Sequence, residues 1–192
     1  MDISENAAIV TDGVPSRKAL DFTASCLDGS AIRLGELRGK KVWLTFFHFI
    51  ECPVCRFRAG EMINRYPGWA NPEFELVAVF HTEARTVKRL LGIEATPFPL
   101  VCDPLKDLYL LYGLGYAGVL NLLHPGYVFS AVKSILGGIK PPKSFSRATS
   151  LPGDFLINPD GSLHHSYFGT FMGDHIPTGR VEEWLGFKLS MD

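Results

Sequence analysis

The sequence predicts a single α/β domain with a mixed, mainly parallel central sheet and helices on both of its faces. Apolar runs typical of strands alternate with segments of helical periodicity, as in parallel strands joined by crossover helices. Two Asp-Gly turns between strand-like segments predict hairpins, which add antiparallel strands at the sheet edges. The 192 residues make one domain of ordinary size, long enough to bury a core without disulfide staples.

The first expected elements follow an N-terminal arm. Residues 1–18 are polar and are predicted to form a flexible arm. Residues 21–37 are typical of a hairpin, because the glycine of Asp28-Gly29 tolerates the positive φ of a tight turn. Residues 42–49, VWLTFFHF, form a continuous apolar run. Such a run predicts a strand buried on both faces, and residues 74–81 predict a second one.

Helices are predicted after these strands. Pro53 starts one that extends to about Tyr66, because proline is favoured at the first helical position. A second helix is expected to be capped by Thr82 and ended by Gly92. After a short strand at residues 98–102, Asp103-Pro104 opens a third helix. Leu105, Leu108 and Tyr109 are expected to share one side of this helix.

The C-terminal part combines an insertion with a second hairpin. Residues 113–150 have a weaker pattern and are interpreted as an insertion with some helix. Residues 154–168 predict a hairpin that turns at Asp160-Gly161, and residues 177–187 predict a short amphipathic helix. Residues 19–192 are therefore expected to form one domain.

Charge and hydropathy exclude several classes of partner. The formal net charge is -1, so no basic surface for nucleic acid or for an anionic membrane is expected. No stretch approaches the roughly 20 apolar residues of a membrane span. The first residues contain neither a basic region nor an apolar block, so no signal peptide is expected. A cytoplasmic protein without a membrane partner is the expectation.

Two cysteines stand where a buried strand gives way to a helix, in ECPVCRFR. With Pro53 as the first helical residue, Cys52 is the N-cap, near unpaired N–H groups and the positive end of the helix dipole, which favour a thiolate. Arg56 adds positive charge one turn further on. Cys55 shares the helix face and lies within disulfide reach. Cys52 is predicted to be the exposed nucleophile, and Cys55 the more buried partner that resolves its disulfide.

A purely structural pair and a zinc site are the alternatives to a redox pair. Small buried cysteines need neither this spacing nor a neighbouring proline. A structural zinc site needs four ligands, and a second Cys-x-x-Cys or His-x-x-His is missing. The adjacent His164 and His165 point to opposite faces of a strand. The sequence therefore predicts thiol redox chemistry, with no metal and no cofactor.

Four segments resemble the thioredoxin-like redoxins, specifically the peroxiredoxin-like AhpC/TSA branch. The resemblance covers roughly residues 18–186 and implies a thioredoxin-like fold. The segments are DFTASCLDGSAIRLGELRGKKVWLTFF, ECPVCR, FPLVCDPLKDLYLLYGLG and LPGDFLINPDGSLHHSYFG. The third and fourth segments look like members that carry a Cys-Pro-x-Cys site in place of a single cysteine.

The resemblance implies two candidate reactions, and three positions bear on the choice. Typical peroxiredoxins have a Pro-x-x-x-Thr/Ser-x-x-Cys segment, but here Thr45 and Phe49 hold the proline and hydroxyl positions. Pro152 stands where that family has an arginine, for which Arg147 is a nearby substitute. In disulfide oxidoreductases of this fold, a proline at this point resembles the cis-proline loop facing the Cys-x-x-Cys. Both a cis and a trans Leu151–Pro152 bond remain open.

Disulfide exchange by Cys52 and Cys55 is the first functional prediction, supported by Pro53 and Pro152. The alternative is an antioxidant thiol peroxidase that reduces hydrogen peroxide or alkyl hydroperoxides. A non-catalytic binding module with this fold, and a carrier of zinc or copper, are further alternatives. The expected partners are a thiol reductant, a disulfide-containing protein or a peroxide. A homodimer is a further expectation, with residues 126–138 apolar enough to contribute a contact, to cover the site or simply to pack.

The remaining residues near the site receive plainer interpretations. Glu51 would raise the thiol pKa if it pointed inward, but a solvated position at the strand end is preferred. Cys102 is interpreted as a small buried hydrophobe, with a third reactive thiol as the alternative. His48 is interpreted as a hydrogen-bonded core histidine, with proton transfer as the alternative. Asp174-His175 is interpreted as a turn and not as an acid–base pair.

Overall fold

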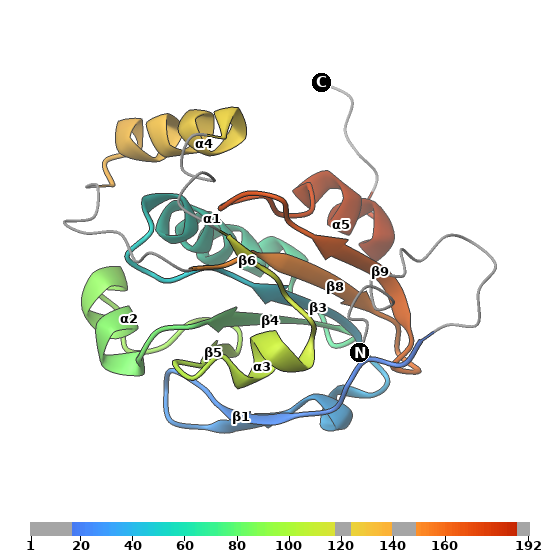
Figure 1. The fold of residues 1–192 in the computed structure, drawn as a ribbon. Helices are drawn as coiled ribbons and strands as arrows, with labels where there is room; N and C mark the ends of the chain where they lie inside the picture. The colour runs from blue at the N-terminus through green and yellow to red at the C-terminus, as the bar shows by residue number, and fades with distance from the viewer. Residues whose placement is uncertain (1–16, 118–123, 140–148, 188–192) are drawn as a thin grey trace, which may run out of the picture.

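A five-stranded mixed sheet forms the centre of the molecule (Figure 1). The computed structural model describes residues 17–117, 124–139 and 149–187. The sheet has the strand order β5-β4-β3-β8-β9. Its strands are β3 (Lys41–Phe46), β4 (Phe74–Phe80), β5 (Leu100–Cys102), β8 (Gly153–Ile157) and β9 (Leu163–Phe168). β3, β4 and β5 are parallel, and the β8–β9 hairpin adds two antiparallel strands at one edge. The predicted mixed sheet is confirmed.

Alternation along β3 divides the core between the two faces of the sheet. Val42, Leu44 and Phe46 contact the core on one face, whereas Trp43 contacts the core on the other. All four are buried, as the continuous apolar run predicts for a central strand. The chain that leaves the end of β3 leads directly into the cysteine segment.

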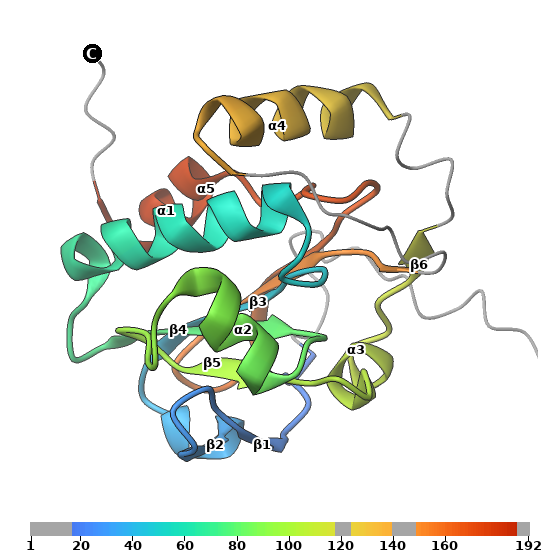
Figure 2. The same ribbon diagram turned by 90° about the vertical axis from the view of Figure 1, so that its left-hand side faces the viewer.

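Helices cover the face of the sheet to which Trp43 points. They are α1 (Pro53–Trp69), α2 (Ala84–Leu91), α4 (Pro125–Leu136) and α5 (Thr178–Leu185), and each contributes at least one residue to that core cluster. α4 lies over α1, as Figure 2 shows. Of the helices that the structure describes, none is long and apolar enough to cross a membrane.

The N-terminal hairpin lies on the opposite face. β1 (Thr23–Ser25) and β2 (Ala31–Arg33) form their own two-stranded sheet, and Gly29 turns between them with a φ of 88°. A single bridge between Cys26 and Val101 links this hairpin to β5. The expectation that the first hairpin extends the central sheet is therefore wrong. Phe22 and Ile32 are buried against the sheet face, so the hairpin packs across the sheet instead of along its edge.

Two predicted helix starts differ from the observed ones. The N-cap of α2 is Glu83, because the Thr82 hydroxyl instead accepts a hydrogen bond from the Ile50 N–H at 3.2 Å. α3 (Asp107–Leu111) begins four residues after Asp103, whose carboxylate accepts hydrogen bonds from the N–H groups of its first residues. Leu105 therefore precedes the helix and is 77% exposed, so its predicted place on one helix side with Leu108 and Tyr109 is wrong. Gly92 ends α2 in the left-handed conformation, as predicted.

The insertion at residues 113–150 is closed at its base by a short antiparallel pair. β6 (Tyr116–Ala117) pairs with β7 (Thr149–Ser150), so the two ends of the insertion lie side by side. α4 is the helix expected within the insertion. Residues 1–16 of the predicted arm (1–18) and the position of Arg147 lie outside the described residues.

Candidate functional site

The cysteine segment occupies the start of α1. Cys52 is the N-cap residue and Pro53 the first helical residue, as predicted. The Cys52 carbonyl accepts the first helical hydrogen bond from the Arg56 N–H at 3.0 Å, so Cys55 lies within that first turn. Cys52 and Cys55 are both free cysteines.

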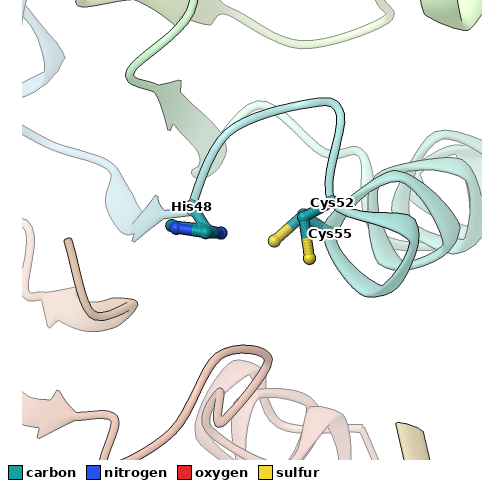
Figure 3. Close-up of side chains that lie close together, drawn as sticks. All are labelled: His48, Cys52 and Cys55. Atoms are coloured by element: carbon teal, nitrogen blue, oxygen red, sulfur yellow. The ribbon is translucent and has the colours of Figure 1, made fainter. Parts of the chain in front are cut away.

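The side chain of a histidine, His48, lies close to the two thiols, as Figure 3 shows. His48 lies in the loop after β3, and this loop turns back so that the His48 ring faces the start of α1. One ligand atom of each of His48, Cys52 and Cys55 lies within 4.8 Å of the other two. We call these three side chains the thiol–imidazole group. The core position interpreted for His48 is confirmed, because the residue is fully buried, but apart from the Cys52 thiol its ring nitrogens have no hydrogen-bond partner.

The environment separates the acidities of the two thiols. The neighbouring Cys55 thiol is the largest influence that lowers the pKa of Cys52, and it outweighs the opposite effect of burial. The nearby His48 imidazole lowers the pKa of Cys52 further. Burial raises the pKa of Cys55, and the adjacent Cys52 adds to that shift. Cys52 is therefore the more acidic thiol and Cys55 the less acidic one, in the order that the sequence predicts.

The predicted exposure of Cys52 is wrong. Its exposed fraction is 1%, and Cys55 is fully buried. The buried Tyr127 of α4 lies close to both: burial raises its pKa, and the neighbouring Cys52 and Cys55 add to that shift. The insertion thus covers the start of α1, which a pattern confined to residues 51–58 does not reveal.

Replacing His48 by Phe is expected to raise the pKa of Cys52. The substitution removes the imidazole that favours the thiolate but keeps a ring of similar shape among Phe49 and His81, whose rings lie 4.0 and 5.3 Å from that of His48. Thiolate absorbance in the ultraviolet, followed against pH, measures the change. His81→Phe is the matched control and is expected to leave the curve in place. If the titration curves of the wild type and His48→Phe coincide, the His48 imidazole does not lower the pKa of Cys52.

Pro152 precedes β8 and is buried. Its preceding peptide bond is trans, since the described residues contain no cis peptide, and this resolves the alternative left open by the sequence. The Pro152 carbonyl accepts a hydrogen bond from Gly169 at 2.9 Å. Gly169 begins a loop (169–174) that reaches α1, because a Cβ on Gly173 would meet Val54 Cγ1 at 2.5 Å. Pro152 is thus linked to the cysteine segment through this loop.

The remaining predicted residues lie outside the thiol–imidazole group. Glu51 is half-buried and lines a surface pocket with Phe49 and His81. Cys102 is half-buried and not fully buried as interpreted, and burial raises its pKa to about 11, so it stays a thiol near neutral pH. Arg56 follows Cys55 in α1 and is partly exposed. The effect predicted for its charge stays a prediction.

Gly173→Ala is expected to destabilise the protein more than Gly92→Ala. Both glycines have positive φ, 97° and 70°, a conformation that costs a residue with a Cβ about 1–2 kcal/mol. At Gly173 the new Cβ also clashes with Val54, adding about 1–3 kcal/mol, whereas the space around Gly92 is open. Urea denaturation of both variants measures the difference. If both variants lose the same free energy of unfolding, the loop at residues 169–174 can move to accept the new Cβ without disturbing α1.

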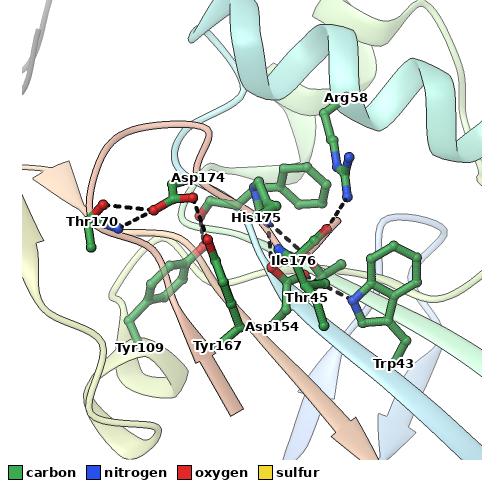
Figure 4. Close-up of polar contacts among 11 residues, drawn as sticks. Trp43, Thr45, Arg58, Tyr109, Asp154, Tyr167, Thr170, Asp174, His175 and Ile176 are labelled. Atoms are coloured by element: carbon green, nitrogen blue, oxygen red, sulfur yellow. Dashed lines mark hydrogen bonds and ion pairs between the residues drawn. The ribbon is translucent and has the colours of Figure 1, made fainter. Parts of the chain in front are cut away.

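A second buried polar cluster lies beneath the loop, as Figure 4 shows. Asp154 of β8 lies 3.0 Å from His175 Nδ1 and accepts hydrogen bonds from Trp43 Nε1 and the Ile176 N–H. Arg58 of α1 donates to the Ile176 carbonyl at 3.1 Å. We call Asp154, His175, Trp43 and Arg58 the aspartate cluster. It joins the central sheet, α1 and the C-terminal segment.

Burial alone would raise the pKa of Asp154. The opposite charge and hydrogen bond of His175, with the Arg58 charge, nevertheless hold that pKa below its ordinary value. Asp174 has the predicted turn role, accepting from Thr170 and from the Tyr167 hydroxyl. His175 does not, because it pairs with Asp154. The sequence analysis missed this pair, whose members are 21 residues apart, and an aspartate within the apolar strand GDFLI is the one signal that could have indicated it.

The fold and the paired cysteines define a thioredoxin-like redoxin with a Cys-x-x-Cys segment at the start of its first long helix. The chain belongs to the AhpC/TSA family, whose sequence model matches residues 15–166. This result confirms the peroxiredoxin-like branch indicated by the sequence.

Among the curated proteins, the thiol-disulfide oxidoreductase ResA of Halalkalibacterium halodurans is similar. It is 32% identical over 98 residues, which make up 50% of this chain and 55% of the relative. The chain therefore matches only about half the length of this relative.

Two solved structures with low sequence identity share the fold. Peroxidoxin BcpB of Mycobacterium tuberculosis superposes with a TM-score of 0.59 at 17% identity, covering 89% of this chain and 93% of the other. The exposed lipoprotein thioredoxin Etrx1 of Streptococcus pneumoniae gives 0.55 at 18% identity, covering 87% and 98%. The thioredoxin-like fold is confirmed.

Proposed function

We propose that the protein is a thiol-disulfide oxidoreductase that uses Cys52 as nucleophile and Cys55 as resolving thiol. One observation carries the proposal: two free thiols share the first turn of α1, with the pKa of the N-cap thiol lowered and that of its partner raised. This asymmetry gives one thiol for attack and one for resolution. The similarity to ResA over half the chain supports the same reaction.

The exchange reaction balances in two steps. The Cys52 thiolate attacks one sulfur of a disulfide, forms a mixed disulfide and releases the other sulfur as a thiolate. Cys55 then loses its proton and attacks Cys52 Sγ. This step forms the Cys52–Cys55 disulfide and releases the second thiolate. Two electrons pass from the protein dithiol to the partner, and a thiol reductant restores the starting state.

One observation favours a second candidate, a thiol peroxidase. Cys52 is almost fully buried, so a small peroxide reaches it with less rearrangement than a protein disulfide does. Membership of the AhpC/TSA family supports this candidate. Against it, position 49 carries no hydroxyl: Phe49 is buried, and its ring lies tilted against that of His48. Pro152 likewise leaves its position without an arginine to stabilise the leaving hydroxide.

Disulfide and peroxide consumption by the reduced protein separates these candidates. Removal of the reductant is followed by stoichiometric oxidised glutathione in one reaction and hydrogen peroxide in another. Alkylation and peptide mass then follow the two thiols in time. Rapid loss of both free thiols with oxidised glutathione but not with hydrogen peroxide supports exchange. Rapid loss of both thiols with hydrogen peroxide supports the peroxidase. If neither reagent removes the thiols, the protein is a non-catalytic member of the fold.

Two expectations from the sequence stay predictions. A cytoplasmic location is one of them. The other is a homodimer, supported by a row of exposed apolar side chains on the outer face of α4. The row contains Val128, Phe129, Val132, Ile135 and Leu136. Sedimentation of the wild type and of Phe129→Ser tests whether this row holds two copies together.

A further inference from the structure

The thiol–imidazole group contains a residue that thiol exchange does not require. His48 is fully buried, and apart from its interaction with the Cys52 thiol neither ring nitrogen has a hydrogen-bond partner. Whichever tautomer is present, one of these nitrogens carries a free lone pair. A buried acceptor left without a partner is unfavourable, so a ligand that takes up this lone pair would stabilise the site. The ring faces the two sulfur atoms, as Figure 3 shows.

The spacing of the three donor atoms fits a single metal ion. In zinc sites the bonds to thiolate sulfur and to imidazole nitrogen are about 2.3 and 2.0–2.1 Å long, so three donors spread around one ion of this size lie about 4 Å apart. The donor atoms of His48, Cys52 and Cys55 all lie within 4.8 Å of one another. Only a small movement is needed to close them around an ion.

We propose that His48, Cys52 and Cys55 form a binding site for Cu(I). Thiolate sulfur is a soft ligand that selects Cu(I) or zinc, and imidazole suits both metals. Zinc in proteins almost always takes four ligands, with water completing the set in open sites. In the described part of the chain, no fourth histidine, cysteine or carboxylate joins the group. Cys52 is 1% exposed, so water has little access, and a three-coordinate soft ion suits the site best.

Cu(I) binding and disulfide formation exclude one another. Cu(I) takes the place of the protons on whichever of Cys52 and Cys55 are still thiols, and these protons leave to solvent. The Cys52–Cys55 disulfide has no thiolate to offer, so oxidation of the pair by a disulfide releases the ion as Cu(I). The inference rests on the three donors alone and holds whether or not the protein catalyses thiol exchange.

Competition for Cu(I) under anaerobic conditions tests the proposal. The reduced protein is titrated into the Cu(I) complex of the chromophoric chelator bathocuproine disulfonate, and X-ray absorption identifies the ligands. The expected result is one Cu(I) per chain, bound by two sulfur atoms and one nitrogen atom. The disulfide form of the protein is expected to take none.

Substitutions identify the ligands. His48→Phe, Cys52→Ser and Cys55→Ser are each expected to weaken binding by at least about 10–100-fold, since even residues that only orient a metal ligand have effects of that size. The matched controls are His81→Phe and Cys102→Ser, which remove a neighbouring histidine and another free cysteine outside the group. These controls are expected to bind as the wild type does, and circular dichroism confirms that each variant is folded.

Three results would overturn the proposal. They are failure of the reduced protein to compete for Cu(I), unchanged affinity in His48→Phe, and preferential binding of Zn(II) in a parallel titration. Oxidation by glutathione, measured on the same preparation, keeps this test separate from the proposed reaction. Protein that forms the disulfide but takes no copper refutes the metal site alone, and copper binding without disulfide formation refutes the exchange reaction alone.

Discussion

Replacing Asp154 by Asn is expected to lower the free energy of unfolding by about 1–3 kcal/mol, the cost of leaving buried hydrogen-bonding groups without a partner. Asp154 is fully buried and accepts from Trp43 Nε1 at 3.0 Å and from the Ile176 N–H at 2.9 Å. Asn keeps one acceptor oxygen but loses the charge that faces His175. Urea denaturation followed by circular dichroism measures the loss.

The same carboxylate gives stability a dependence on acid pH. Its pKa in the folded protein is below the ordinary value, so the unfolded chain binds its proton more readily. The contribution is therefore fully present above the unfolded pKa of about 3.9 and is lost as the pH falls through the lower, folded pKa. Wild-type stability should decline in this acid range, and Asp154→Asn should remove that part of the decline.

Asp160→Asn is the matched control. Asp160 also has a lowered pKa, about 2, caused first by its hydrogen bonds with Ser162, but it is exposed at a turn and Asn keeps an acceptor there. A much smaller change in stability is expected. If Asp154→Asn lowers the free energy of unfolding no more than Asp160→Asn does, the aspartate cluster does not hold the sheet, α1 and the C-terminal segment together.

Local patterns were sufficient for the central strands and for the start of α1. A continuous apolar run can be satisfied only by burial on both faces, and β3 has that environment. Proline and cysteine at the helix start are likewise local signals, and Cys52 is the N-cap. The first hairpin shows the limit: its turn could be predicted, but its place on the sheet depends on contacts of Phe22 and Ile32 with distant residues.

The residues missed in the site depend on contacts between segments far apart in the chain. His48 continues the apolar run, so its pattern predicts a core position. Its approach to the thiols depends on the path of the loop between β3 and α1. The burial of Cys52 depends on α4, which starts more than 70 residues later and brings Tyr127 over the site. Asp154 and His175 meet only because β8 and the C-terminal segment are adjacent.

Cys52→Ser is expected to reduce disulfide exchange by at least about a thousandfold, because it removes the nucleophile itself. Cys55→Ser should instead stop the reaction after the first step, since Cys52 can still attack but nothing resolves the mixed disulfide. Incubation with oxidised glutathione should therefore leave one glutathionyl group on Cys52 of this variant, detected by peptide mass. Cys102→Ser, whose lost thiol has a pKa raised to about 11, is the control and should behave as the wild type does.

The Cys55 side chain affects how readily Cys52 acts as the nucleophile, because it influences the pKa of Cys52. The Cys55 thiol is the largest influence that lowers the pKa of Cys52, and a serine hydroxyl at that position remains able to donate a hydrogen bond. Cys55→Ala has no such donor, so its Cys52 should have a higher pKa and form the mixed disulfide more slowly than in Cys55→Ser. The opposite outcome, with the glutathionyl group trapped on Cys55 in Cys52→Ser, would reverse the two roles. It would also show that burial, and not the lower pKa, decides which thiol attacks first.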